Sequence, residues 1–378
     1  MILPDELDAA RGRLKAWLLE AAYPIWWDVG ADHSGGGFHD RLNLDGTPQP
    51  GLKRLRVQAR QAWAFALAEA LGWRGPGADA SRHGLDFVRT WRTAGGLYRL
   101  APRPADAPLD GMGELYDQAF VMLALAVARP AAGAPTAEVE ARALRERLAD
   151  FADPLGGYAE APGVPAPLFA NPNMHLFEAY QAWAANSVDP MWAAEADRLG
   201  DLALTHLIDP RTGALAESFG PGWSLPAPPE RWTIWPGHLF EWAWLLLRWR
   251  GGDPATRAAA LRLVDVAEAH GVDPARKVAI YALDDELAPV DSSARLWSQT
   301  ERIKATALAA SLTGRPELWD AARQACEGLE RFFEVPTRGL WRDRMLADGS
   351  FAEEAAPASS FYHIVGAITE LERLATVG

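Results

Sequence analysis

A histidine and a glutamate stand near the start of the most apolar segment of the chain. Segment 235–247 opens with Trp-Pro-Gly, carries His238 and Glu241, and is otherwise almost entirely apolar. Proline suits the first turn of a helix, and a helix that is apolar nearly all round has no face for solvent. The spacing of three residues places both side chains on one face, within reach of each other. A buried imidazole beside a carboxylate indicates either acid–base chemistry or a histidine held in the core by a hydrogen bond.

The same design, a polar residue near the start of an apolar helix, recurs five more times. The intervals between successive positions lie between 57 and 63 residues, which predicts six copies of one structural unit. The copy at 171–178 repeats the proline and the His–Glu pair as well. The six polar residues are Arg60, Asp117, His175, His238, Glu301 and His363.

The elements between these positions repeat too. Each unit is predicted to be an outer amphipathic helix, a glycine–aromatic hairpin and an inner apolar helix. The outer helices are expected at 5–27, 79–92, 137–151, 190–207, 254–270 and 316–333, and the inner ones at 56–72, 114–128, 172–186, 236–249, 297–312 and 360–375. Stacked helix pairs need neighbours to bury a shared core, and closing the stack removes its exposed ends. We therefore predict an all-α fold, an (α/α)6 barrel of six outer and inner helix pairs, as a single domain over residues 1–378.

In such a ring all inner helices begin at the same mouth. The six polar residues would therefore converge there, and short β-hairpins would surround them. The proline-rich segments 101–110, 161–172 and 220–231 are expected to complete the rim.

Composition narrows the possible partners. The net charge is −13, without a basic cluster, which disfavours nucleic acid and anionic membrane. Arg248 and Arg250 interrupt the longest apolar run, so we expect no membrane span. The sequence begins without a secretory signal and has a single cysteine, Cys326, which predicts a cytoplasmic protein. The 17 tryptophans offer flat apolar faces that suit sugar rings, although most should fill the helical core.

Five short patterns follow one another along the chain: Tyr116-Asp117-x-Ala119-Phe120, Asn171-x-x-x-His175-x-x-x-Ala179-Tyr180, Pro236-Gly237-His238-x-x-Glu241-Trp242, Trp297-x-Gln299-x-Glu301 and the terminal His363. Together they resemble the N-acylglucosamine 2-epimerase superfamily, which includes renin-binding-protein-type epimerases, cellobiose 2-epimerases, mannose isomerases and sulfoquinovose isomerases. The resemblance covers essentially the whole chain. It implies an (α/α)6 barrel, in agreement with the repeat.

The resemblance also implies a chemistry, proton transfer at C1–C2 of an open-chain aldose through an enediolate. It makes His238 and His363 the acid/base pair, with Glu241 setting the tautomer and basicity of His238. It implies that Arg60 supports the developing oxyanion. The other residues that it implies are Asn171 and His175 for ring opening or hydroxyl binding, and Asp117, Trp297 and Glu301 as contacts to substrate or supports for the histidines. It implies no cofactor and no metal ligands.

The expected function is that of a sugar isomerase acting on a free monosaccharide, D-mannose to D-fructose, as a monomer or homodimer. A 2-epimerase of glucose and mannose, or of N-acetylglucosamine and N-acetylmannosamine, is the alternative, because it would use the same histidine pair. A glycoside hydrolase with Asp117 and Glu301 as its carboxylates is more distant, since it leaves the histidines unexplained. The sequence also leaves open a non-catalytic sugar-binding protein and a metal site at His175, Glu178, His238 and Glu241.

Overall fold

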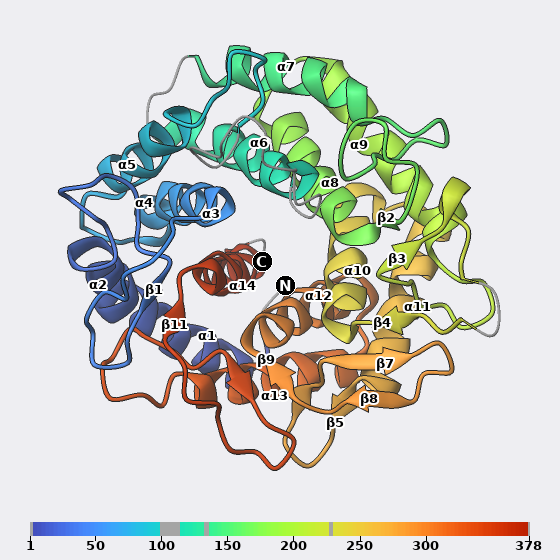
Figure 1. The fold of residues 1–378 in the computed structure, drawn as a ribbon. Coiled ribbons are helices and arrows are strands. Elements are labelled where there is room, and N and C mark those ends of the chain that lie inside the picture. Colours follow the sequence, from blue (N-terminus) through green and yellow to red (C-terminus); the bar gives the residue numbers. More distant parts are fainter. Residues whose placement is uncertain (1–2, 99–113, 132–135, 227–229, 377–378) are drawn as a thin grey trace.

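Two concentric rings of helices surround a common axis (Figure 1). The computed structural model describes residues 3–98, 114–131, 136–226 and 230–376. The inner ring comprises α3 (Leu55–Ala66), α6 (Glu114–Ala131), α8 (Ala170–Asn186), α10 (Pro236–Arg250), α12 (Leu296–Thr313) and α14 (Ser359–Thr376). The outer ring comprises α1 (Asp5–Trp17), α5 (Gly77–Arg89), α7 (Ala137–Leu148), α9 (Pro190–Leu202), α11 (Pro254–His270) and α13 (Pro316–Phe332). The ring closes because α14 packs between α12 and α3, and this arrangement confirms the predicted (α/α)6 barrel.

Several predicted helices are continued or interrupted by short segments. The first one runs on from α1 through a π-helical turn, η1 (Leu18–Ala22), into α2 (Tyr23–Asp28). The predicted helix 56–72 is divided at Leu67 into α3 and α4 (Ala68–Leu71). The remaining turns are η2 (Ala149–Phe151), η3 (Ala203–Leu207) and η4 (Pro221–Trp223).

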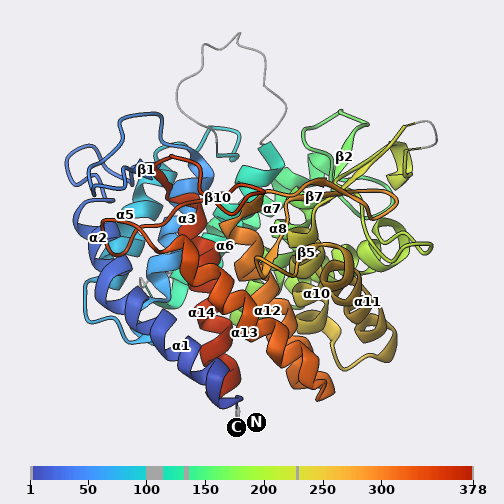
Figure 2. The same cartoon turned by 90° about the horizontal axis from the view of Figure 1, so that it is seen from below.

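Short antiparallel strands lie together at one end of the barrel (Figure 2). One sheet has three strands, β4 (Thr233–Ile234), β7 (Ala282–Asp284) and β8 (Pro289–Asp291). The paired strands are β1 (Arg41–Leu42) with β11 (Ala356–Pro357), β2 (Leu168–Phe169) with β3 (Ser218–Phe219), β5 (Val272–Asp273) with β6 (Val278–Ala279), and β9 (Ala294–Arg295) with β10 (Arg344–Met345). The strands β2, β4, β9 and β11 lead directly into inner helices, so they fix where those helices begin. Of the three segments expected at the rim, 101–110 lies outside the described residues.

A buried amide side chain ties each of four hairpins to the inner helix that follows it. The amide oxygen accepts the backbone N–H of one hairpin residue, and the amide nitrogen donates to the C=O of that same residue. The pairs are Gln58 with Phe38, Gln118 with Tyr98, Asn173 with Tyr158, and Gln299 with Ala279, at distances of 2.6 to 3.0 Å. Because the N–H and C=O groups are buried, they need partners, and these amides fix the hairpin against the helix.

The inner helices have almost no face in water. In α10 every residue from Pro236 to Leu247 is buried, and in α12 the same is true from Ser298 to Ala310. The outer helices are amphipathic. Large aromatic side chains fill the space between the inner and outer helices; Trp26, for example, stacks on Trp341 at 5.1 Å between ring centroids. Among the described residues, no helix combines the length and hydropathy needed to cross a membrane.

We predict that Gln299→Met destabilises the fold. The variant keeps the length of the side chain but leaves the buried N–H and C=O of Ala279 without partners. Each such group costs about 1–3 kcal/mol, so the free energy of unfolding in guanidinium chloride should fall by at least that amount. Gln324→Met is the matched control, because Gln324 bonds an exposed aspartate on the outer ring. Equal effects of the two variants would contradict the role of the amide.

Candidate active site

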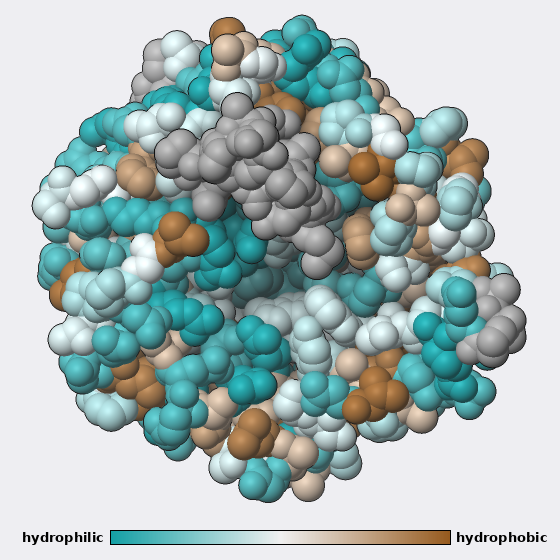
Figure 3. All heavy atoms as spheres, in the orientation of Figure 1, coloured by the Kyte–Doolittle hydropathy of each residue, from teal (hydrophilic) through white to brown (hydrophobic). Residues whose placement is uncertain are grey.

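A cavity of about 510 Å³ opens at the mouth of the barrel, among the first turns of the inner helices. Figure 3 shows a largely hydrophilic hollow at the centre of this face. Seven of the predicted site residues line the cavity: Arg60, Asn171, His175, His238, Glu241, Trp297 and His363. The ring therefore gathers side chains from α3, α8, α10, α12 and α14, as the repeat predicted.

His238 reaches the cavity from α10, and its partner is Glu217 rather than Glu241. Nδ1 of His238 lies 2.7 Å from Oε2 of Glu217, a residue next to β3. The ring lies beside both Trp235 and Trp297, with centroids 4.9 Å away in each case. If Glu217 accepts the proton of Nδ1, the lone pair of Nε2 is free for a proton from substrate. The expected pairing of His238 with Glu241 is wrong, because Glu217 occupies the position beside Nδ1.

Glu241 points toward the floor of the site instead. Among the described residues, neither of its buried oxygens has a hydrogen-bond partner, and Oε1 lies 3.8 Å from Nδ1 of His175. Burial, together with the nearby charge of Glu301, raises the pKa of Glu241 well above its usual value. Both effects favour the protonated form of this carboxyl group.

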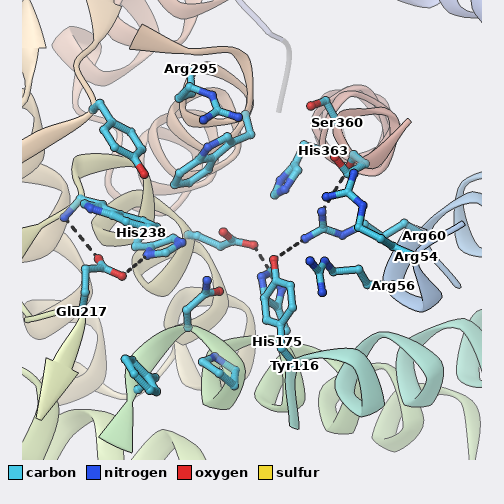
Figure 4. A pocket seen from close by; sticks show the side chains of 18 of the residues that line it. Arg54, Arg56, Arg60, Tyr116, His175, Glu217, His238, Arg295, Ser360 and His363 are labelled. Carbon is cyan, nitrogen blue, oxygen red and sulfur yellow. Dashed lines mark hydrogen bonds and ion pairs between the residues drawn. The ribbon is translucent and has the colours of Figure 1, made fainter. Parts of the chain in front are cut away.

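His363 enters the cavity from α14, opposite His238 (Figure 4). Its Nδ1 lies 2.8 Å from Oε1 of Glu301, a fully buried residue of α12. The other oxygen of Glu301 lies 2.5 Å from Nζ of Lys304. Burial, followed by the charges of Arg60 and Lys304, holds the pKa of His363 well below its usual value. His363 is therefore a neutral imidazole that can act as a base.

His175 lies deeper, on α8, where aromatic rings surround it. The centroid of Phe120 is 4.4 Å away and that of Tyr116 is 5.2 Å away. Burial lowers the pKa of His175 to about 3, although Glu178, 3.6 Å from Nδ1, opposes the shift. His175 is thus uncharged at neutral pH and can exchange hydrogen bonds with a hydroxyl group.

Arg60 supplies a buried positive charge at the edge of the cavity. The guanidinium donates to the hydroxyl of Tyr116 at 2.7 Å and lies over the ring of Phe120 at 4.0 Å. In the part of the chain that the structure describes, no carboxylate forms an ion pair with Arg60, and its Nε has no hydrogen-bond partner. Arg60 does not pair with Asp117 or Glu301, so its charge remains available to an anion in the cavity.

Asp117 and Glu301 do not line the cavity. Asp117 forms an ion pair with Arg56 at 3.1 Å, and Glu301 holds His363. The carboxylate of Asp117 is thus engaged by Arg56 and that of Glu301 by His363. Each acts on the cavity only through this partner, which does line the cavity. Asn171, by contrast, lines the cavity, and its amide oxygen has no hydrogen-bond partner in the part of the chain that the structure describes, which suits a sugar hydroxyl.

Sequence reasoning missed Glu217 and several other residues that line the cavity. Glu217 is the one charged residue in the stretch Ala-Leu-Ala-Glu-Ser-Phe at 214–219, and this contrast was a usable signal. Arg56 lies in the first turn of α3, and the others lie on strands or on connecting segments, where no periodic pattern marks them: Arg54, Glu160, Trp235, Tyr281 and Arg295.

Two overlapping groups of side chains on the floor have the residue types of a metal site. They are His175, Glu178 and Glu241, and Glu241, Glu301 and His363, with ligand atoms within 4.8 Å of one another. The ammonium of Lys304 already neutralises Glu301, and Tyr362 donates a hydrogen bond to Glu178. These contacts disfavour a metal cation at either group. That the enzyme works without a metal remains a prediction.

The mouth of this (α/α)6 barrel holds two histidines, each in contact with a carboxylate. It also holds an arginine that has no carboxylate partner among the described residues. These groups are the ones that an enzyme needs to transfer a proton at the carbon next to a carbonyl group. Comparison with known proteins agrees with this class. Residues 36–367 match the family model of N-acylglucosamine 2-epimerase (GlcNAc 2-epimerase). The chain belongs to this family of sugar isomerases and 2-epimerases, and it is an enzyme of that kind.

Individual relatives span nearly the full chain. A mannose-6-phosphate isomerase from Rhizobium meliloti is 42% identical over 375 residues, which cover 96% of each chain. A D-mannose isomerase from Thermobifida fusca is 30% identical over 89% of this chain and 88% of the relative. A crystal structure of a D-mannose isomerase superposes with a TM-score of 0.84 over 96% of this chain and 97% of that one, at 22% identity. At this level of identity, the superposition shows that the two chains share a fold.

The buried, neutral state of His175 predicts a pH-dependent stability. The unfolded chain protonates such a histidine near pH 6.5, whereas the folded chain does so only near 3. The unfolded state thus binds more protons between these values, and the free energy of unfolding falls as the pH falls. His175→Phe should reduce this slope by about 1.4 kcal/mol per pH unit between about pH 4 and 6. Denaturation at several pH values measures the slope, with His270→Phe, an exposed histidine, as control; an unchanged slope would show that His175 is not buried in its neutral form.

Proposed function

We propose that this protein is an aldose–ketose isomerase that converts D-mannose to D-fructose by proton transfer between C2 and C1. The observation that carries the proposal is the pair of imidazoles on opposite sides of one cavity, each with Nδ1 on a glutamate. A cavity of about 510 Å³ is in the range of small-molecule sites. The relatives named for mannose and mannose 6-phosphate support the choice of sugar.

The reaction begins with the open-chain aldose, whose aldehyde carbon is C1. One histidine takes the proton from C2, and the electron pair moves to give an enediolate with negative charge on O1. Arg60, which has no carboxylate partner among the described residues, stabilises that charge. The proton is then delivered to C1, and the O2 proton moves to O1, which leaves a hydroxyl on C1 and the C2 carbonyl of the ketose. His175 and Asn171 bind hydroxyls and assist ring opening.

The same groups support a 2-epimerase if the proton returns to the other face of C2. Two histidines on opposite sides of the substrate fit that outcome as well, because one could remove the proton and the other replace it. Isomerisation is preferred here because the two relatives at or above 30% identity are both named as isomerases.

A second candidate is the same reaction on mannose 6-phosphate. It is favoured by three further arginines that line the cavity and by the name of the relative from Rhizobium meliloti. Each arginine gives part of its guanidinium to an aspartate, and the rest remains for a phosphate. The pairs are Arg54 with Asp40, Arg56 with Asp117, and Arg295 with Asp343.

Proton NMR in D2O distinguishes these outcomes. Purified enzyme is incubated separately with D-mannose, mannose 6-phosphate, D-glucose and N-acetylglucosamine. We expect D-mannose to give fructose, with deuterium entering at C1. Glucose formed from mannose, or a 2-epimer of the amino sugar, would instead establish an epimerase. If mannose 6-phosphate alone were turned over, the substrate would be the phosphate ester and not free mannose. If no product formed and no deuterium entered at C2 with any of these sugars, both forms of the proposal would be contradicted.

Glu217→Gln should lower turnover while the fold stays intact. A glutamine can present its N–H to Nδ1 of His238, which moves the proton to Nε2 and removes the base. In a serine protease triad, the corresponding change costs about 10⁴-fold, so we expect kcat to fall by about 10²-fold or more. Glu330→Gln, which breaks an ion pair on the outer ring, is the matched control. Equal kcat for wild type and Glu217→Gln would remove His238 from the mechanism.

A further inference from the structure

A lysine is buried inside the inner ring without lining the cavity. Lys304 lies one turn after Glu301 on α12 and is 1% exposed. Its ammonium contacts Oε2 of Glu301 at 2.5 Å and lies over the ring of Trp244 at 3.8 Å. Burying an ammonium group costs several kcal/mol unless it is paired. A methionine of similar length would fill this space without that cost, so the charge itself needs an explanation.

The contacts of Glu301 supply one. Its Oε1 meets Nδ1 of His363 at 2.8 Å, so Lys304, Glu301 and His363 form a chain that ends in the cavity. The state of Glu301 decides which nitrogen of the imidazole carries the proton. An ionised Glu301 accepts the hydrogen of Nδ1 and leaves a lone pair on Nε2. A protonated Glu301 donates to Nδ1, and the imidazole proton then lies on Nε2. Nε2 in that state has no lone pair to accept a proton, so it cannot act as a base.

The surroundings push Glu301 toward the protonated state. The carboxylate is fully buried, and Glu178 and Glu241 approach it from α8 and α10. Burial raises the pKa of Glu301, and Lys304 opposes that rise by its charge and its hydrogen bond. The other titratable groups around the pair are Arg60 from α3, His175 from α8, His238 from α10, and Tyr362 beside His363. Among the described residues, Lys304 is the cation in direct contact with Glu301.

We propose that Lys304 is a positioning residue that keeps Glu301 an acceptor and so holds His363 in the tautomer whose Nε2 faces the substrate. The proposal rests on the catalytic role of His363 given above, but it makes a separate claim about the tautomer. Glu217 contacts Nδ1 of His238 in the equivalent position, at the more exposed rim of the cavity.

The test uses the full chain with 15N-labelled histidine, and the His363 signals are identified by their loss in His363→Gln. In the wild type we expect the proton on Nδ1. Lys304→Met keeps the packing on Trp244 but removes the charge, so the proton should move to Nε2. Turnover should fall at least about 10-fold with KM nearly unchanged. The acidic limb of the kcat profile should move to higher pH, because Glu301 must lose its proton for activity to return.

Two variants complete the experiment. Lys304→Arg retains the charge and should restore the Nδ1–H tautomer and the position of the acidic limb. Lys277→Met, which removes an exposed lysine paired with Glu327, should change neither. A purely structural role for Lys304 would reduce turnover without moving the tautomer or the limb.

Each result decides between the claims. An Nδ1–H tautomer in Lys304→Met, or no rescue by arginine, overturns the role of Lys304. A tautomer that switches while turnover stays at the wild-type level upholds the positioning role and instead overturns the catalytic role of His363. If Lys304→Met does not fold, the wild-type spectrum still tests the proposal, because an Nε2–H tautomer there contradicts it.

Discussion

Six inner helices with almost no face in water can hold a charged side chain only where the barrel opens or where another group pairs with it. An unpaired charged group halfway along α10 or α12 would cost several kcal/mol. The residues that line the cavity accordingly lie at the first turns of the inner helices and on the segments beside them, whereas Lys304, halfway along α12, is paired with Glu301. The position of the site, its mixture of charged and aromatic groups, and its rigidity all follow from this constraint.

The floor of the site shows how the constraint is met. Glu178, Glu241 and Glu301 are buried there with Lys304 and Arg60. Lys304 pairs with Glu301, and the contacts of Glu178 with His175, together with the charge of Lys304, lower the pKa of Glu178 against the effect of burial. Burial and the charge of Glu301 raise the pKa of Glu241, which favours its protonated form. Arg60 forms no ion pair with a carboxylate among the described residues, so its charge is available to the negative charge that develops on a substrate oxygen.

The extent of what the sequence could predict follows from the same physics. Helix periodicity and a 57–63-residue repeat are local and regular, so the positions of the inner helices were predictable, as was the convergence of Arg60, His175, His238 and His363 on one cavity. The pairing of those residues was not, because helix spacing allowed His238 to meet Glu241, whereas the fold of a short hairpin brings Glu217 to it. Asp117 was expected in the cavity but pairs with Arg56 behind the wall, and only the rotation of α6 within the ring decides that. Lys304 was not singled out from the sequence, because its position in a predicted inner helix does not show which buried group its charge meets.

The division of labour between helices and connecting segments bears on specificity. His175, His363, Glu301 and Lys304 belong to buried helices whose mutual positions are fixed by close packing, so their geometry leaves little freedom for variation. Arg54, Glu217, Tyr281 and Arg295 stand on strands and connections at the mouth, where insertions and substitutions disturb the core least. In the proposed mechanism, proton transfer uses His363 with Glu301 and Lys304 from the first group, and His238 with Glu217 at the mouth. We expect the other residues of the mouth to contact the far end of the sugar, so a single barrel can keep the same imidazole pair while these residues set the choice of sugar.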